Sequence, residues 1–217
     1  MEENTARASY HIVTGEGNGE ITEKKSRFIA GVFPVHSAAE AEARIQETRK
    51  HFWDARHHCY AYALGARRET TRCSDDGEPS GTAGKPILEV LTGADLTDTL
   101  IIVTRYFGGV LLGTGGLVRA YTRAAQAGLS AASQAEMVYG NKITIDIGYP
   151  SVTPIQRYLR EHDLIASDIK YEETVHVEVY IISSDIENFC ADIRQLTDGR
   201  AELSQGEASF FPKPVPS

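Results

Sequence analysis

The chain has 217 residues and a mass of 23.8 kDa, which fits one large domain or two small ones. Hydrophobic residues make up 41% and charged residues 24%, as in an ordinary globular protein, which excludes extensive disorder. No apolar run reaches the roughly 18 residues of a membrane span, and the acidic start of the chain is unlike a signal peptide. Three cysteines without a Cys-x-x-Cys pair form neither a disulfide framework nor a zinc site, so we expect a cytoplasmic protein with reduced thiols and no membrane partner.

The net charge of −8 is unevenly distributed. Residues 1–135 have a net charge of −1 and residues 136–217 of −7, while residues 24–72 alone carry +5. Because polyanion binding depends on neutralising phosphates, the whole chain is a poor non-specific binder of nucleic acid. The basic window still allows local contacts with RNA, with a solvated surface of mixed charge as the simpler interpretation.

Strand and helix patterns alternate in the first part of the chain. In chain order, the predicted elements are a strand at 10–13, a turn at 15–19, a strand at 26–35, a helix, a strand at 58–64, a polar loop at 67–84, a helix starting at 86–91, a strand at 100–105, a glycine loop at 108–116 and a helix at 117–132. Ser37 and Glu40 form a capping box that starts the first helix, because each side chain satisfies a backbone N–H group near the other.

After Ser133 the pattern changes, and a second domain is expected over residues 141–207. In chain order it has a strand at 143–149, a helix capped by Thr153, strands at 165–172 and 174–182, a helix opened by a capping box at 184–187 and stopped by Gly199, and a strand at 200–207. The order β-α-β-β-α-β is that of a ferredoxin-like fold. A junction near 133–141 is expected to separate it from a first domain at 1–135, and the Pro-rich tail at 208–217 is expected to be extended or disordered.

The densest polar cluster lies between Cys73 and Pro86. Its three carboxylates, Asp75, Asp76 and Glu78, could hold a divalent cation such as Mg²⁺ through oxygen ligands. The alternative is a surface loop whose Asp side chains cap backbone groups. The spacing does not fit an EF-hand, so these residues are a candidate acidic cluster and no metal site is established.

Two glycine segments, 81–85 and 113–116, lead into helices, whose N-termini present free N–H groups to an anion. Lys85, Arg105 and Arg119 could add charge-assisted hydrogen bonds. Neither segment is a Walker A motif or a dinucleotide fingerprint, and the alternative is that the glycines only permit tight turns. The residues expected to bind an anion or nucleic acid on this surface are Lys85, Arg105, Tyr106, Gly108, Gly109, Gly113, Thr114, Gly115, Gly116, Arg119, His57 and His58.

The strand around Cys59 carries two adjacent histidines. His57 and His58 point to opposite faces of a strand, so they rarely share one metal ion, and a polar contact from one of them to the glycine loops is more plausible. Cys59 is expected to be a small buried hydrophobe rather than a nucleophile. Tyr106 and its neighbour Phe107 either offer stacking faces to unpaired RNA bases or belong to the core. Arg105 and Arg119 are expected to matter more for binding than for folding.

Several motifs taken together resemble the IMPACT family, in particular its bacterial YigZ branch. They are Asp54–Cys59, Ser74–Pro86 and Arg105–Tyr121, with Lys24–Phe28 similar to the opening motif of that branch. The resemblance covers about residues 10–205. It implies an α+β protein in which an N-terminal α/β domain similar to domain 2 of ribosomal protein S5 is followed by a ferredoxin-like domain similar to the C-terminal domain of elongation factor G.

The resemblance also implies a translation-associated regulatory protein that binds RNA or the ribosome through the glycine loops of its first domain. The acidic second domain could then meet a basic protein partner. The eukaryotic members act through an additional N-terminal domain for which this chain has no room, so their kinase regulation is not expected here. The alternative is a Mg²⁺-dependent phosphate-handling hydrolase or transferase, and a third hypothesis is a protein-interaction adaptor that uses the open face of the ferredoxin-like sheet. The resemblance implies no catalytic residue and requires no cofactor, so whether the protein is an enzyme stays open.

Overall fold

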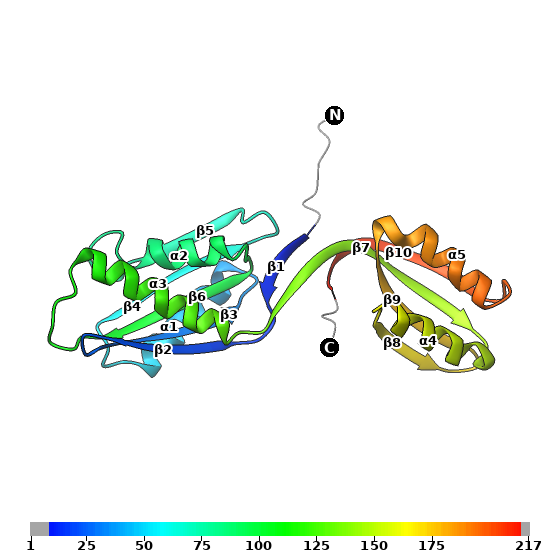
Figure 1. Ribbon diagram of the computed structural model, residues 1–217, viewed down its shortest axis with the longest axis horizontal. Coiled ribbons are helices and arrows are strands. Elements are labelled where there is room, and N and C mark those ends of the chain that lie inside the picture. The colour runs from blue at the N-terminus through cyan, green and yellow to red at the C-terminus, as the bar shows by residue number, and fades with distance from the viewer. Residues whose placement is uncertain (1–8, 214–217) are drawn as a thin grey trace, which may run out of the picture. The chain divides into compact units, whose positions relative to one another are not determined.

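A computed structural model describes residues 9–213 and divides the chain into two compact units, residues 1–135 and 136–217 (Figure 1). Each unit has a β-sheet with helices packed on it and a hydrophobic core of its own. The α+β class is confirmed, as is the order of an α/β domain followed by a ferredoxin-like domain. None of the helices within residues 9–213 has both the length and the apolar character needed to cross a membrane.

The first unit is built around a five-stranded antiparallel sheet in the order β2-β3-β6-β4-β5. Its elements are β1 (Ser9–Val13), β2 (Gly17–Glu23), β3 (Ser26–Pro34), α1 (Ala38–His51), β4 (His57–Leu64), β5 (Thr70–Ser74), α2 (Gly84–Gly93), β6 (Thr99–Tyr106) and α3 (Thr114–Ser130). Helices α2 and α3 cover one face of the sheet, and α1 covers the other (Figure 1).

Side-chain alternation along β4 explains why both faces are covered. Cys59 and Ala61 join the core beneath α2 and α3, whereas Tyr60 and Tyr62 join the core beneath α1. Successive side chains of a strand point to opposite faces, so a strand with the unbroken hydrophobic run Cys59–Leu64 needs a helical layer on each side. Ser37 caps α1 as predicted, because its Oγ accepts a hydrogen bond from the backbone N–H of Glu40 at 3.2 Å. The reciprocal bond differs from the prediction, since the Glu40 carboxylate accepts from the backbone N–H of His36 at 2.8 Å.

Two strands of this unit contradict the sequence prediction. The predicted turn at 15–19 contributes Gly17 and Gly19 to β2, because these glycines let the strand lie against α3. A Cβ atom on either residue would lie 2.4 Å from a backbone atom of Gly128 in that helix. Likewise, the predicted loop at 67–84 contains β5, an exposed edge strand that pairs with β4 and has too little apolar character to be recognised as a strand.

The second unit has the predicted order β-α-β-β-α-β and the sheet order β8-β9-β7-β10, with every pair antiparallel. Its elements are β7 (Gln134–Ile147), a short 3₁₀ turn (Tyr149–Ser151), α4 (Val152–Glu161), β8 (Ala166–Tyr171), β9 (Val175–Ile182), a second 3₁₀ turn (Ser183–Asp185), α5 (Ile186–Leu196) and β10 (Glu202–Pro212). Helices α4 and α5 pack on one face of the sheet through Ile155, Leu159, Phe189 and Ile193.

Several local details of the second unit differ from the prediction. Helix α4 begins one residue before Thr153, so this residue does not cap it, and Ser184 donates to its neighbour Asp185 instead of capping α5. Gly199 lies beyond the end of α5 with a φ of 74°, as a stop residue should.

Strand β7 runs through the predicted junction at 133–141, and β10 extends to Pro212, so most of the predicted tail within residues 9–213 is strand. Residues 214–217 of that tail lie outside the described residues.

Candidate functional site

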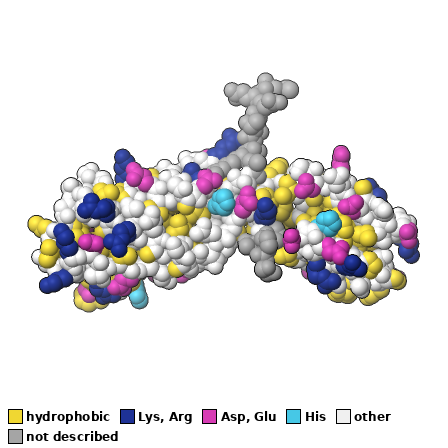
Figure 2. Space-filling view, viewed as in Figure 1, with side chains coloured by type: hydrophobic (Ala, Val, Ile, Leu, Met, Phe, Trp, Pro, Cys, Tyr) yellow, Lys and Arg dark blue, Asp and Glu magenta, His cyan; other side chains and the backbone are white. Residues whose placement is uncertain are grey.

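Four loops of the first unit meet at one end of its sheet. The strand register places Arg27 opposite Tyr106 and His57 opposite Arg105, so β3 and β4 start where β6 ends. The loops at this end are 24–25, 52–56, 75–83 and 107–113. We call this end the glycine-loop face, and it unites all four motifs that the sequence analysis singled out. Figure 2 shows Lys and Arg side chains gathered at this end of the unit.

Asp75 caps helix α2 from a distance. Its carboxylate accepts hydrogen bonds from the backbone N–H groups of Gly81, Ala83 and Gly84 at 2.8–2.9 Å. Residue Ala83 precedes the helix and cannot cap it with its own side chain, so Asp75 satisfies N–H groups that would otherwise be free. Burial raises the pKa of Asp75, but the three N–H donors outweigh burial and hold this pKa below its ordinary value.

Asp76 joins the loop to α1 and β4. Its carboxylate accepts a 2.6 Å hydrogen bond from the Arg49 guanidinium and another, also of 2.6 Å, from the backbone N–H of His58. Burial raises the pKa of Asp76, and these two donors lower it further than burial raises it. Asp76 has a φ of 41°, a conformation that Asp tolerates better than most residues.

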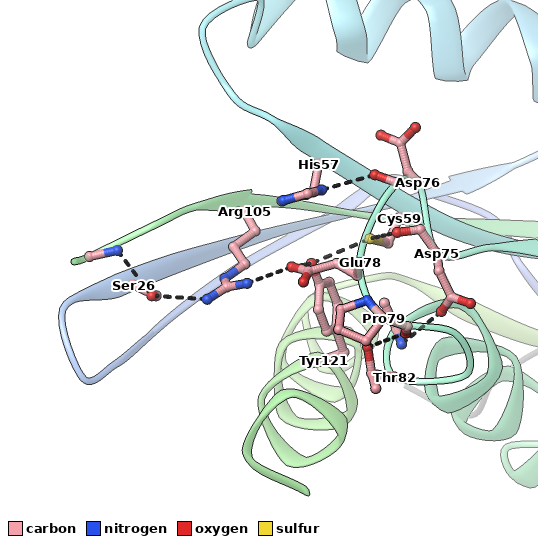
Figure 3. Close-up of polar contacts among 12 residues, drawn as sticks. Ser26, His57, Cys59, Asp75, Asp76, Glu78, Pro79, Thr82, Arg105 and Tyr121 are labelled. Atoms are coloured by element: carbon pink, nitrogen blue, oxygen red, sulfur yellow. Dashed lines mark hydrogen bonds and ion pairs between the residues drawn. The ribbon is translucent and has the colours of Figure 1, made fainter. Parts of the chain in front are cut away.

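Glu78 is the centre of a buried polar network (Figure 3). Its Oε1 accepts hydrogen bonds from Arg105 Nη1 at 2.7 Å and from the Tyr121 hydroxyl at 2.8 Å. The side chains of Glu78 and Arg105 are only 4% and 7% exposed. The Arg105 guanidinium also lies against the rings of Phe28 and Phe107, at 5.4 and 5.6 Å from their centroids. These contacts favour a role for Arg105 in bracing the loop, beside the expectation that it serves binding more than folding.

The candidate acidic cluster does not converge in space. Asp75 points to the start of α2 and Glu78 points into the core toward Tyr121 (Figure 3), whereas the Asp76 carboxylate accepts a hydrogen bond from Arg49. Among residues 9–213, no group of three or more His, Cys, Asp or Glu side chains is arranged to hold a metal ion. The three carboxylates therefore fit the alternative reading, in which acidic side chains of a loop satisfy donors of the protein itself.

The histidines and Cys59 also serve the protein's own structure. His57 donates from Nδ1 to the carbonyl oxygen of Asp76 at 2.9 Å, and His58 donates from Nε2 to that of Phe52 at 3.2 Å. Burial lowers the pKa of His58, which favours the neutral ring. Cys59 donates to the carbonyl oxygen of Asp75 at 3.0 Å, and burial raises the pKa of its thiol. The buried thiol is therefore a poor nucleophile, in agreement with its predicted role as a core residue.

The glycines of the β6–α3 loop have two different roles. Gly108 packs on the β2–β3 hairpin, where a Cβ atom would lie 2.1 Å from the carbonyl carbon of Lys25, and its N–H donates to Ser26 Oγ at 3.1 Å. Gly109 and Gly113 have φ values of 83° and 69°, which a residue with a side chain rarely adopts. The loop is thus fixed at Gly108 by close packing, while Gly109 and Gly113 allow the chain to turn because glycine adopts a positive φ readily.

Helix α3 begins without a cap. Gly113 has no side chain to offer, and the first turn, formed by Thr114, Gly115 and Gly116, contains no acidic residue. Two of these glycines, predicted as loop residues, are therefore helical. Among residues 9–213, no side chain accepts a hydrogen bond from the N–H groups of this turn, and together with the helix dipole these groups form a positive end.

A recess of about 90 Å³ lies beside this helix start. Its lining includes three cationic side chains, Lys24, Arg119 and Arg123, and one acidic side chain, Glu23. Arg123 is paired with Glu23 at 3.1 Å, whereas neither Lys24 nor Arg119 forms an ion pair within residues 9–213. Lys85 lies apart from the recess on α2, is exposed, and approaches Glu89 at 3.9 Å.

Two exposed side chains of the glycine-loop face, Trp53 and Leu111, were not predicted from the sequence, whereas Phe107 was predicted either to stack on bases or to belong to the core. Trp53 and Leu111 are 82% and 83% exposed, and Phe107 is 52% exposed. Tyr106 donates to the Asp54 carboxylate at 2.7 Å, which links the loop of Trp53 to the end of β6. A feature of the sequence could have singled out Trp53 as a binding residue. It is the one tryptophan of the chain and lies between His51 and Arg56, within the basic window of residues 24–72. Burial depends on tertiary contacts, so the sequence pattern alone does not show that Trp53, Phe107 and Leu111 are exposed.

We expect the stability of the first unit to fall in acid, and Asp75→Asn to remove part of this dependence. The folded-state pKa of Asp75 is depressed, so its contribution is complete above the unfolded-state pKa of about 4 and is lost as the pH falls below it. At neutral pH the substitution should cost about 1–2 kcal/mol, because an amide cannot accept all three N–H groups. Urea unfolding of both chains from about pH 3 to pH 7 measures this. Asp198→Asn is the control, and identical pH profiles of the wild type and Asp75→Asn would contradict the assignment.

Comparisons with known proteins match both units. The profile of the Impact N-terminal domain matches residues 24–129, which contain the whole glycine-loop face, and a domain of unknown function (DUF1949) matches residues 145–200. A solved structure, described as the crystal structure of a hypothetical protein, is 32% identical with a TM-score of 0.60, over 93% of this chain and 98% of that one.

Similar proteins occur in bacteria and in eukaryotes. IMPACT family member YvyE of Bacillus subtilis is 38% identical over 95% of this chain and 95% of its own length. IMPACT family member YigZ of Escherichia coli is 35% identical over 83% of this chain and 89% of its own length. Protein IMPACT of Bos taurus is 33% identical, but the match spans 43% of this chain and 30% of that protein. With the motifs of the glycine-loop face and these relatives in agreement, the chain belongs to the IMPACT family.

Proposed function

We propose that this protein is a translation-associated regulatory protein that binds RNA, on its own or within the ribosome, through the glycine-loop face. The observation that carries the proposal is the recess at the start of α3, where Lys24 and Arg119 lack carboxylate partners within residues 9–213 beside an uncapped helix N-terminus. Uncompensated cations and free N–H groups are the groups that a backbone phosphate recruits.

Aromatic side chains of the glycine-loop face, of which Phe107 and Trp53 are exposed and Tyr106 is half-buried, support RNA rather than an isolated small anion. Phe107, Tyr106 and Trp53 all belong to loops of the glycine-loop face or to the strand end beside them. The Arg27 guanidinium lies 5.8 Å from the centroid of the Tyr106 ring, so cationic and aromatic groups are interleaved. Unpaired bases stack on aromatic rings while cations contact the backbone, a combination that suits single-stranded RNA.

The charge of the second unit favours the ribosome over free RNA. Residues 136–217 carry a net charge of −7, which repels a bare polyanion. A ribosome presents basic protein surfaces beside its RNA, so the two units would each find a complementary partner there. The same negative charge would also attract a basic protein that is not part of the ribosome.

We expect the triple variant Lys24→Gln, Lys25→Gln, Arg119→Gln to lose ribosome association while it stays folded, where Lys25 is the exposed neighbour of Lys24 in the β2–β3 loop of the glycine-loop face. Each phosphate contact to single-stranded RNA contributes about 0.7 to the slope of log K against log salt, so three lost contacts should lower the slope by about 2. Co-sedimentation with ribosomes at graded salt measures both affinity and slope. The matched control is Arg157→Gln, Arg160→Gln, Lys170→Gln, which removes the same charge from the second unit. Equal losses in both variants, or no association of the wild type even at low salt, would refute the proposal.

Thermal-shift measurements with Mg²⁺, a nucleoside triphosphate and oligonucleotides distinguish RNA binding from the alternative hypothesis of a phosphate-handling enzyme. Its Mg²⁺ ligands would be the carboxylates that already accept hydrogen bonds from Arg49, Arg105 and backbone groups of the loop. Stabilisation by Mg²⁺ with a nucleoside triphosphate would favour the enzyme. Stabilisation by oligonucleotides alone is the result we expect.

A further inference from the structure

The second unit contains a half-open cavity of about 560 Å³ that the proposed function does not use. It lies where the end of α4, the start of α5 and the end of β9 come together, and Phe211 of β10 is part of its lining. Its volume is in the range of pockets that hold small molecules.

Aromatic side chains form much of the cavity wall. Tyr158 and Phe189 lie with their ring centroids 6.0 Å apart on the helix side, and Tyr180 stacks on Phe211 at 5.0 Å on the sheet side. The faces of such rings are negative, and they attract ammonium groups as well as the methylene groups between them. The wall therefore suits an aliphatic chain that carries positive charge.

Three carboxylates line the same cavity, namely Asp163 after α4, Asp185 at the start of α5 and Asp192 within α5. Within residues 9–213, no Lys or Arg forms an ion pair with any of them, and Lys213 of the lining is paired with Glu136 at 3.5 Å. The Tyr158 hydroxyl donates to Asp192 at 2.7 Å and fixes that carboxylate at the wall. The cavity thus has an excess of negative charge that the described part of the protein leaves uncompensated.

We propose that this cavity binds a linear aliphatic polyamine. A chain with several ammonium groups separated by methylenes places its charges on Asp163, Asp185 and Asp192 and its apolar spacers between the rings. A metal ion would leave the rings without a contact, a neutral apolar molecule would leave the carboxylates without a partner, and a nucleotide would be repelled. This inference is independent of the glycine-loop face, which lies in the first unit.

The test is isothermal titration of the full chain with spermidine at physiological salt. We expect saturable binding to one site, and loss of about tenfold or more in affinity in the double variant Asp163→Asn, Asp192→Asn, because the variant removes two of the three carboxylates that would accept charge-assisted hydrogen bonds from ammonium groups. Asparagine still accepts the Tyr158 hydroxyl, so the wall stays in place. The matched control is Asp168→Asn, Asp198→Asn, which removes the same charge from exposed ion pairs with Lys170 and Arg200 and should bind as the wild type does.

Further probes separate this site from general attraction to an acidic surface. 1,8-Octanediol, an uncharged chain with polar ends, should not bind, and Mg²⁺ at equal charge should not displace spermidine. In NMR spectra, spermidine should shift the ring signals of Tyr158, Tyr180 and Phe189. Absence of saturable binding, equal losses in the control variant, displacement by Mg²⁺, or binding of a lysine-rich peptide at these rings without binding of spermidine would each overturn the proposal.

Discussion

Arg105→Ala is expected to lower the free energy of unfolding by about 3–5 kcal/mol, the usual cost of removing one partner of a buried ion pair. The substitution leaves the Glu78 carboxylate buried, with Tyr121 as its remaining side-chain donor. It also removes the guanidinium that packs against Phe28 and Phe107. Urea unfolding monitored by circular dichroism measures the loss.

Two further variants separate bracing from binding. Arg119→Ala removes an exposed guanidinium, so it should hardly change the unfolding midpoint but should weaken ribosome association. The double variant Arg105→Met, Glu78→Leu removes both charges and should recover much of the stability, because no unpaired charge stays buried. If Arg105→Ala instead unfolds at the wild-type midpoint and loses only ribosome association, Arg105 is a binding residue and the brace assignment is wrong.

Gly108→Ala is expected to cost about 3 kcal/mol, in the upper part of the range for overpacking. The added Cβ atom would lie 2.1 Å from the carbonyl carbon and 2.2 Å from the oxygen of Lys25, and backbone atoms cannot move aside as a flexible side chain can. Since Gly108 joins the β6–α3 loop to the β2–β3 hairpin, the variant should also displace Lys24 from the recess and weaken ribosome association.

Gly93→Ala is the control for this effect. A Cβ atom on Gly93 would meet nothing within 4 Å, and this residue ends α2 without a positive φ. It should therefore change the unfolding free energy by no more than about 0.5 kcal/mol. Thermal and urea unfolding of both variants provide the comparison. Equal stability of Gly108→Ala and the wild type would show that the loop does not depend on this contact.

The sequence by itself determined the features that arise within short segments. Alternation in Val175–Ile182 identifies a half-buried strand, and Ser37 with Glu40 identifies a helix start, because both signals depend on neighbours a few residues away. The ferredoxin-like order of the second unit follows from such local signals taken in sequence. The uneven charge of the two units can likewise be counted directly.

Only the tertiary structure decided what the loop residues do. An aspartate in a polar loop can bind a cation or cap a helix, and the structure shows Asp75 accepting hydrogen bonds from the backbone N–H groups of Gly81 and Gly84 at the start of α2. Two glycines with the spacing of Gly17 and Gly19 suit a turn as well as a strand that packs on a helix. Only the position of Gly128 beside both residues distinguishes the two. The physical reason is that the roles of these loop residues depend on hydrogen-bond donors, cations and backbone atoms that are up to about a hundred residues away in the sequence but close in the fold. A local sequence pattern contains no information on such contacts.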